Sequence, residues 1–167
     1  MSDSFGGGIW NYGATMTVTN STISANSAPT GGDIMIDVQG AANIEDTILN
    51  AGASGVTIFT SNASTVTSLG YNLASDNGGG YLTGPGDQIN TDPMLGPLQD
   101  NGGPTFTHAL LPGSPAINAG DPNFTPPPVN DQRGFPRVAN GRIDKGSFEV
   151  QRPASTPRPR PTPAPRP

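Results

Sequence analysis

Carboxylates are the chemically active groups in the repetitive part of the sequence, where Asp33, Asp37, Glu45 and Asp46 occur without any Lys, Arg or His. Paired carboxylates act as general acid and base in glycoside hydrolysis, and a basic residue is needed over an acidic sugar for elimination. Asp33 and Asp37 flank an apolar trio, residues 34–36, and Asp46 falls at a predicted turn. We therefore favour structural roles for these carboxylates, and catalysis stays the alternative.

A mixed-charge cluster lies near the end of the sequence. Its members are Asp131, Arg133, Arg137, Arg142, Asp144 and Lys145. Such a cluster forms either a binding or active site, or a fastening between two segments of the chain. Because the guanidinium fork of an arginine matches a carboxylate, we favour the fastening. We predict that Arg133 pairs with a nearby acid and pins the closing segment to the last turn of the repetitive fold.

The sequence offers little for metal or nucleophilic chemistry. Cysteine is absent, and His108 is the single histidine, which we interpret as a packed, hydrogen-bonded residue. Calcium is the cation that the oxygen-rich turns at residues 100–101 and Asp121 would suit, but their spacing fits no known calcium loop. We therefore predict no catalytic residue, no cofactor and no metal ligand.

The composition limits the fold and the partners. Gly 23 and Pro 19 in 167 residues disfavour a helix bundle, and no apolar run is long enough for a membrane span. Residues 1–132 carry eleven acidic side chains and no Lys or Arg, whereas residues 133–167 carry eight basic and two acidic ones. An acidic body without cations cannot grip a phosphate backbone, so we exclude nucleic acid as its partner.

A repeat of about 25 residues organises the first half of the chain. Its clearest columns are apolar Ile23, Ile48 and Leu73 and polar Asn20, Asp46 and Asn72. Strand-like runs precede each column, at residues 15–19, 42–45 and 65–69. A unit of this size is typical of one coil of a β-solenoid, in which successive strands lie about 4.8 Å apart. We predict that Ile23, Ile48 and Leu73 stack inside the coils and that the polar column shares hydrogen bonds at a turn.

The sequence predicts three regions. Residues 1–80 form about three coils, residues 81–150 form a capping region of the same domain, and residues 151–167 form a disordered proline-rich tail. Within the capping region we expect residues 84–104 to form an ordered loop or a cap without strands. We expect residues 105–120 to pack as a short turn and strand over the end of the stack, and residues 145–150 to form a last strand. Tyr81 and Leu82 are where we expect a weak fourth coil to begin.

Several motifs resemble the C-terminal part of bacterial surface proteins built from right-handed parallel β-helix repeats, known for their choice-of-anchor Q domain. They are SLGYNL at 68–73, DPMLGPLQDNGGP at 92–104, THAL at 107–110, GSPAINAGD at 113–121, DQRG at 131–134 and DKGSFE at 144–149. The resemblance covers residues 6–150 and implies an all-β, right-handed parallel β-helix held at the cell surface or secreted. The family's biochemical activity is generally undefined.

Two departures from the family shape our expectations of function. The sequence contains no recognisable signal peptide and no anchor after its proline-rich tail, so we expect the C-terminal portion of a longer protein or the product of a broken gene. We predict a non-catalytic, adhesin-like scaffold that binds a polysaccharide or an envelope component. The alternative is the C-terminal fragment of a polysaccharide lyase or hydrolase. An uncapped first coil would also self-associate through its unpaired strand edges.

Overall fold

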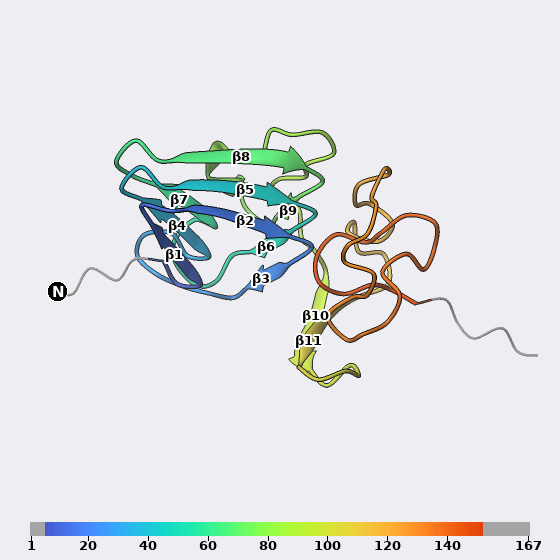
Figure 1. Ribbon diagram of the computed structural model, residues 1–167. Helices are drawn as coiled ribbons and strands as arrows, with labels where there is room; N and C mark the ends of the chain where they lie inside the picture. The colour runs from blue at the N-terminus through green and yellow to red at the C-terminus, as the bar shows by residue number, and fades with distance from the viewer. Residues whose placement is uncertain (1–5, 152–167) are drawn as a thin grey trace, which may run out of the picture.

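A computed structural model describes residues 6–151, so the predicted tail lies almost wholly outside the described residues. The described chain is nearly all-β with parallel strands in stacked sheets, as the composition predicts (Figure 1). The nine strands of the parallel part are β1 (Ile9–Tyr12), β2 (Thr15–Thr19), β3 (Thr22–Ser24), β4 (Ile34–Asp37), β5 (Ala41–Glu45), β6 (Ile48–Asn50), β7 (Ile58–Thr60), β8 (Thr65–Gly70) and β9 (Leu73–Ala74).

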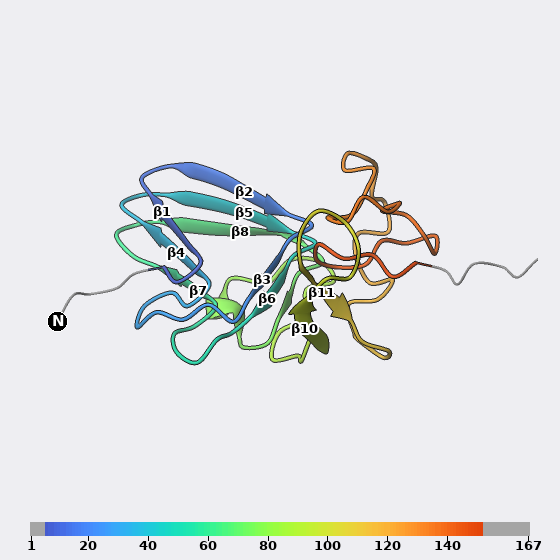
Figure 2. The same cartoon turned by 90° about the horizontal axis from the view of Figure 1, so that it is seen from below.

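Three three-stranded parallel sheets form the body of the molecule, in the orders β1-β4-β7, β2-β5-β8 and β3-β6-β9. Each sheet takes one strand from each of three successive segments, which we call repeat 1 (β1–β3), repeat 2 (β4–β6) and repeat 3 (β7–β9). Figure 2 shows the same stack from below. Short strands separated by tight turns follow from the alternating Thr, Val and Ile residues and from the abundant Gly and Asn.

The apolar cluster enclosed by the three sheets, here called the inner core, differs in its members from the predicted apolar column. Ile23 pairs in register with Leu49, not with Ile48, and Leu49 pairs with Ala74. Leu49 and Ala74 belong to the cluster inside the repeats, and Ile23 packs against it. In this sheet the step from repeat 1 to repeat 2 is one residue longer than the predicted period, and such a slip moves a side chain to the opposite face of a strand.

Ile48 and Leu73 do pair with each other, but they lie in a second apolar cluster. This cluster forms between the β3-β6-β9 sheet and the later part of the chain, which contributes Leu110, Ala116 and Phe148. The predicted column is therefore correct for Ile48 over Leu73 and wrong for Ile23 and for the placement inside the repeats. The apolar pairs at 48–49 and 73–74 signal burial on both faces of the strand.

The chain after repeat 3 contains a short 3-10 helix, η1 (Gly78–Gly80), and an antiparallel hairpin of β10 (Leu95–Gln99) and β11 (Thr107–Leu110). Strand β10 corrects the prediction that residues 84–104 form a loop or a cap without strands, whereas β11 is the short strand expected within 105–120. Residues 84–91 lie along the free side of repeat 3, where Tyr71 and Ala74 donate backbone hydrogen bonds to Pro85 and Gln88. Leu82 packs into the inner core, at the place where the sequence predicts a weak fourth coil.

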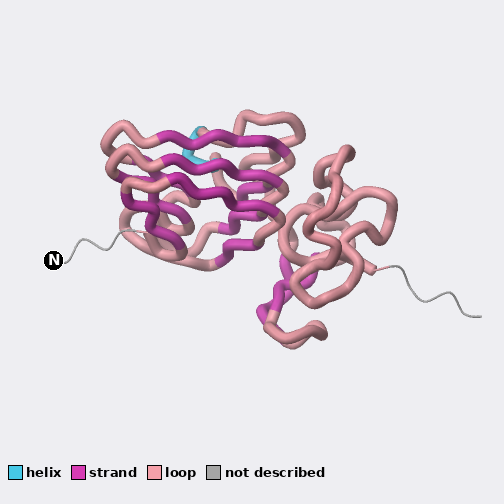
Figure 3. Tube along the Cα trace, viewed as in Figure 1, coloured by secondary structure: helices cyan, strands magenta, loops and turns pink. Residues whose placement is uncertain are grey.

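Residues 112–151, here called the C-terminal segment, are mostly irregular (Figure 3). The predicted last strand at 145–150 is absent because its backbone N–H groups bond to scattered partners and not to one neighbouring strand. Lys145 and Gly146 donate to the carbonyls of Ala116 and Asp46, and three further N–H groups donate to side chains. Ser147 donates to the Thr22 hydroxyl, Glu149 to Asp131 and Val150 to Asp144. The segment lies beside the stack and not over its end, as both ribbon views show.

Candidate functional site

The seam is the corner at which the β2-β5-β8 sheet passes into the β3-β6-β9 sheet. Asn20 and Asp46 occupy it in repeats 1 and 2 with left-handed backbone, φ 49° and 47°, a conformation that Asn and Asp tolerate. In repeat 3 Tyr71 takes that conformation, with φ 56°. Asn72, the residue predicted for the third position, therefore lies one residue beyond the turn.

The predicted ladder of hydrogen bonds among Asn20, Asp46 and Asn72 is not what these side chains make. Asn72 is fully buried, and its amide accepts from the Thr47 N–H and donates to the Ile44 carbonyl, both at 3.0 Å. Asn20 and Asp46 instead bond to the C-terminal segment, as described next. The number of residues from repeat 1 to repeat 2 is one larger than the number from repeat 2 to repeat 3, as the pairs Thr22–Ile48 and Ile48–Leu73 show. This difference moves Asn72 one residue past the position that Asn20 and Asp46 occupy.

The C-terminal segment is attached to every repeat at the seam. In repeat 1, Arg137 donates to the Asn20 side chain at 2.7 Å. In repeat 2, Gly146 donates its N–H to the Asp46 carbonyl at 2.7 Å. In repeat 3, Lys145 donates to the Asn72 carbonyl at 3.1 Å. The structure therefore does bring the three predicted polar residues together, as three attachment points of one segment.

Arg133 forms the predicted ion pair with a nearby acid, Asp131, at 2.7 Å. The same guanidinium donates to the Glu149 carbonyl at 2.6 Å and lies 3.5 Å from the centre of the Phe148 ring. These partners belong to the C-terminal segment, and a further bond from Nη1 goes to the Asn101 carbonyl, between β10 and β11, at 3.4 Å. The prediction that Arg133 pins this segment to the last repeat is therefore wrong, since Lys145 makes that attachment.

Burial perturbs the charged groups near the seam. It raises the pKa of Glu149 to about 7, lowers the pKa of Lys145 to about 8 and lowers the pKa of Arg137. Asp144 accepts from the N–H groups of Asn118 and Val150, yet burial dominates and raises its pKa. Most hydrogen bonds of these groups go to backbone atoms, which is typical of side chains that hold irregular chain in place.

An acidic hollow of about 200 Å³ opens beside the seam. Glu45, Asp46 and Asp121 line it together with Asn20, Asn123 and Phe124. Burial is the main cause that raises the pKa of Glu45, and it raises the pKa of Asp46 to about 6. Of the carboxylates singled out in the sequence, Glu45 and Asp46 meet here, whereas Asp33 and Asp37 lie elsewhere.

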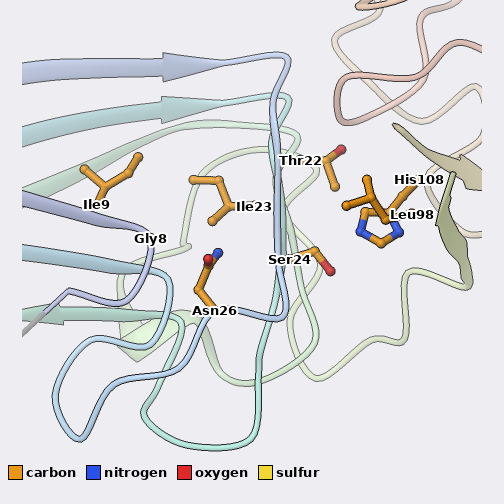
Figure 4. Close-up of a pocket in the computed structure, with 8 residues that line it drawn as sticks. All are labelled: Gly8, Ile9, Thr22, Ile23, Ser24, Asn26, Leu98 and His108. Atoms are coloured by element: carbon orange, nitrogen blue, oxygen red, sulfur yellow. The ribbon is translucent and has the colours of Figure 1, made fainter. Parts of the chain in front are cut away.

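A second hollow, of about 360 Å³, opens at the free end of repeat 1 (Figure 4). Ile9, Ile23 and Asn26 line it on the repeat side, and Leu98 and His108 of the hairpin line it opposite. His108 is half-buried, and its Nδ1 lies 2.7 Å from the Gly96 carbonyl oxygen. Strands β1, β2 and β3 each have a strand partner on one side only among the described residues.

Asp33 is a buried carboxylate behind this end. Its Oδ1 accepts from Asn26 at 3.2 Å, and its Oδ2 has no hydrogen-bond partner. Burial raises its pKa to about 7. Asp37 differs, because Ser61 and Asn62 donate to its carboxylate and lower its pKa.

The oxygen-rich turns considered for calcium are held by local hydrogen bonds. Asp100 accepts from the Gly102 N–H at 2.9 Å, and Asp121 accepts from the Asn123 N–H at 2.9 Å. Within residues 6–151 no three acidic or histidine side chains are grouped so as to hold a metal ion. Calcium binding stays a hypothesis. It requires that EDTA changes the melting temperature of the protein, and an unchanged melting temperature would contradict it.

The sequence reasoning missed an exposed aromatic group on the β1-β4-β7 sheet. Trp10, Tyr12 and Phe59 are 51%, 63% and 38% exposed. The signal is present in the alternation of Ile9-Trp10-Asn11-Tyr12, which predicts a strand with both aromatic rings on one face. The repeat is recognised by apolar residues that stack in the core. These aromatic side chains point outward, so the search for the repeat does not detect them.

Comparisons with protein-family models, with curated proteins and with solved structures gave no match. Among residues 6–151 no helix has the length and apolar character needed to cross a membrane.

Proposed function

We propose that the protein is a non-catalytic, adhesin-like scaffold of the cell surface or the extracellular medium, built as a right-handed parallel β-helix of the choice-of-anchor Q type. Its partner is a polysaccharide or another component of the cell envelope. The attachment of one C-terminal segment to all three repeats carries this proposal. The cations Arg137 and Lys145, which could otherwise act on a substrate, are engaged in holding the C-terminal segment to the repeats.

The seam supports this interpretation residue by residue. Arg137 is 1% exposed and donates to the carbonyls of Asp144 and Gly146 as well as to Asn20. Lys145 is 1% exposed and donates to Gly86 and Gln88 as well as to Asn72. Side chains so enclosed have little access to a polymeric substrate. Of the motifs that resemble the surface-protein family, DKGSFE contributes Lys145 to the seam, and DQRG contributes the Asp131–Arg133 ion pair within the C-terminal segment.

The first experiment is to locate the chain in fractionated native cells with an antibody against residues 100–150. A band in the envelope or the medium supports the surface scaffold. A cytoplasmic band of the size of this chain alone contradicts it. Purified protein is then incubated with plant and bacterial polysaccharides, and the scaffold proposal requires binding without release of reducing or unsaturated ends.

The acidic hollow favours one alternative, the C-terminal portion of a carbohydrate-active β-helix enzyme. Carboxyls whose pKa is raised toward neutrality are suited to proton transfer, and Glu45 and Asp46 share a hollow with the aromatic ring of Phe124. If this alternative holds, new sugar ends appear in the incubation, and Glu45→Gln lowers their rate at least about 100-fold. Turnover that is unchanged in Glu45→Gln assigns the activity to another site.

A further inference from the structure

The outer face of the β1-β4-β7 sheet carries two side-chain columns. Register places Trp10 beside Met35 and Met35 beside Phe59, one residue from each repeat. Two residues further along, Tyr12 lies beside Asp37. The face is turned away from the C-terminal segment, as Figures 1 and 2 show from two directions. This face therefore contains none of the side chains that attach the C-terminal segment at the seam.

The first column is an aromatic platform. Met35 is 1% exposed between its two neighbours, whereas half of Trp10 and more than a third of Phe59 remain exposed. The Tyr12 ring meets the Trp10 ring edge to face with centroids 5.8 Å apart. Two strand spacings separate Trp10 from Phe59, about 10 Å, which is close to the length of two pyranose units in an extended chain. Exposed patches of large apolar side chains mark interaction sites.

The second column supplies polar groups at the edge of this platform. Ser61 and Asn62 both donate to Oδ1 of Asp37, and these bonds lower the pKa of its carboxyl. Asp37 therefore stays ionised at neutral pH and fixed in position next to Tyr12. A fixed carboxylate accepts hydrogen bonds from hydroxyl groups, and the Tyr12 hydroxyl both donates and accepts.

We propose that this face binds a neutral, extended polysaccharide chain. Pyranose rings present C–H groups on their faces and hydroxyls around their rims. The C–H groups fit the electron-rich faces of Trp10 and Phe59, and the hydroxyls fit Asp37 and Tyr12. The eleven acidic residues among residues 1–132, with no Lys or Arg, repel uronic acids and other anionic polymers and so select a neutral chain. The inference rests on the proposed scaffold function and adds its ligand class and its binding face.

The native chain carries its own probe, because Trp10 is its single tryptophan. Titration with cellohexaose, a neutral β-linked glucan, is expected to shift the tryptophan emission to shorter wavelength and to protect it from iodide quenching. Polygalacturonate, an anionic polymer, is expected to leave both signals unchanged. A panel of neutral glucan, mannan and xylan oligosaccharides that changes neither signal overturns the proposal, and so does a response to polygalacturonate alone.

Variants locate the binding independently of fluorescence. In calorimetric titration Trp10→Ala and Phe59→Ala are expected to weaken binding at least tenfold, and Trp10→Phe to retain part of the affinity. Phe106→Ala is the matched control, because Phe106 is an aromatic residue 62% exposed elsewhere on the surface. Equal losses of affinity in Trp10→Ala and Phe106→Ala, or no loss in either variant, contradict the assignment of binding to the Trp10 face.

The two proposals fail in different ways. A protein found at the cell surface that binds no neutral glycan at Trp10 contradicts the platform alone. A cytoplasmic location contradicts the surface scaffold, whereas release of sugar ends contradicts its non-catalytic character. Circular dichroism of Trp10→Ala separates loss of binding from loss of fold, and the titration of the native chain requires no variant.

Discussion

At the scale of single residues, Arg133 combines the interactions that make a buried cation favourable. Its guanidinium donates through Nε and Nη2 to Asp131 Oδ2 at 3.0 and 2.7 Å, and it stacks on Phe148. Asp131 also accepts from the N–H groups of Phe135 and Glu149. Removing the arginine leaves this carboxylate buried without its counter-charge, which is costly in a low-dielectric environment.

We therefore predict that Arg133→Ala lowers the free energy of unfolding by about 3–5 kcal/mol. Arg133→Lys is expected to recover only part of this loss, because an ammonium group cannot donate from two nitrogens to Asp131 Oδ2 or stack as a plane. Thermal unfolding followed by circular dichroism measures the effect. An unchanged melting temperature in Arg133→Ala would remove the structural role.

The buried carboxyls set the direction of the pH dependence. Asp33, Asp46 and Glu149 have folded pKa values of about 7, 6 and 7, above the ordinary values of 3.8, 3.8 and 4.5. Between pH 4 and 7 the folded state therefore binds more protons than the unfolded state, and stability falls as the pH rises. Lys145, with its pKa lowered to about 8, favours folding more as the pH rises beyond that value.

We predict a higher melting temperature at pH 5 than at pH 8, and Asp33→Asn isolates the largest contributor. The amide is neutral at every pH, so the substitution is expected to raise stability at pH 8 by about 1–2 kcal/mol and to reduce the slope between pH 5 and 8. Asp92→Asn on the surface is the control. Parallel pH profiles for Asp33→Asn and the native chain would be the contrary result.

At the scale of elements, the local alternation of apolar and polar residues is enough to predict where the strands lie. It is not enough to predict which side chains of successive strands stack on the same face. The runs at 15–19, 42–45 and 65–69 are strands within a residue of the expected bounds. The steps between repeats are unequal, as Ile34 to Ile58 and Thr22 to Ile48 show, so one fixed period misplaces Ile23. The lengths of turns depend on backbone conformations such as those of Asn20 and Tyr71, which no periodicity encodes.

The seam is only partly predictable for the same reason. Asn20, Asp46 and Asn72 stand out as turn residues, but their partners lie more than 70 positions away at Asp121, Arg137 and Lys145. Contacts at such separation follow from tertiary packing and have no local signature. The acidic hollow is likewise assembled from distant turns, so its members look unrelated in the sequence.

Ile48 tests the assignment of the second apolar cluster. Ile48→Ala is expected to lower the free energy of unfolding by about 2–5 kcal/mol, as for other large-to-small core changes. Because Ile48 belongs to the same apolar cluster as Ala116 and Phe148, the variant should also increase proteolysis within the C-terminal segment. Leu49→Ala, in the inner core, is the comparison and should destabilise without that selective cleavage. Identical cleavage patterns in the two variants would contradict the separation of the clusters.

At the scale of the whole molecule, the two ends of the stack differ. Residues 75–91 cover repeat 3, where Thr57 bonds to Asp76 and Thr60 to Tyr81. At the opposite end, within residues 6–151, β1, β2 and β3 are the edge strands of their sheets, and the half-buried Ile9 and Ile23 line the hollow there. Unpaired edges with apolar side chains beside them promote association between chains.

We predict that the isolated chain self-associates through repeat 1 as its concentration rises. Ile9→Lys places a charge in the hollow at the free end of repeat 1. In sedimentation velocity this variant is expected to contain a larger fraction of monomer than the native chain. Val129→Lys, at an exposed position of the C-terminal segment, adds the same charge elsewhere and should leave association unchanged. A monomeric native chain at high concentration that unfolds cooperatively would contradict the prediction.

The attachment of one segment to three repeats has a mechanical consequence. Arg137, Lys145 and Gly146 lie close together in the sequence, yet each bonds to a different repeat. Tension that enters the chain at Gln151 therefore meets the attachments to repeats 2 and 3 first and the attachment to repeat 1 after them. Repeats bonded to one common segment cannot separate from one another until they leave that segment, whereas stacked repeats without such a segment can separate one at a time. A protein that bears a tether at this end would hold its repeats intact under a pull that unravels an unbraced stack.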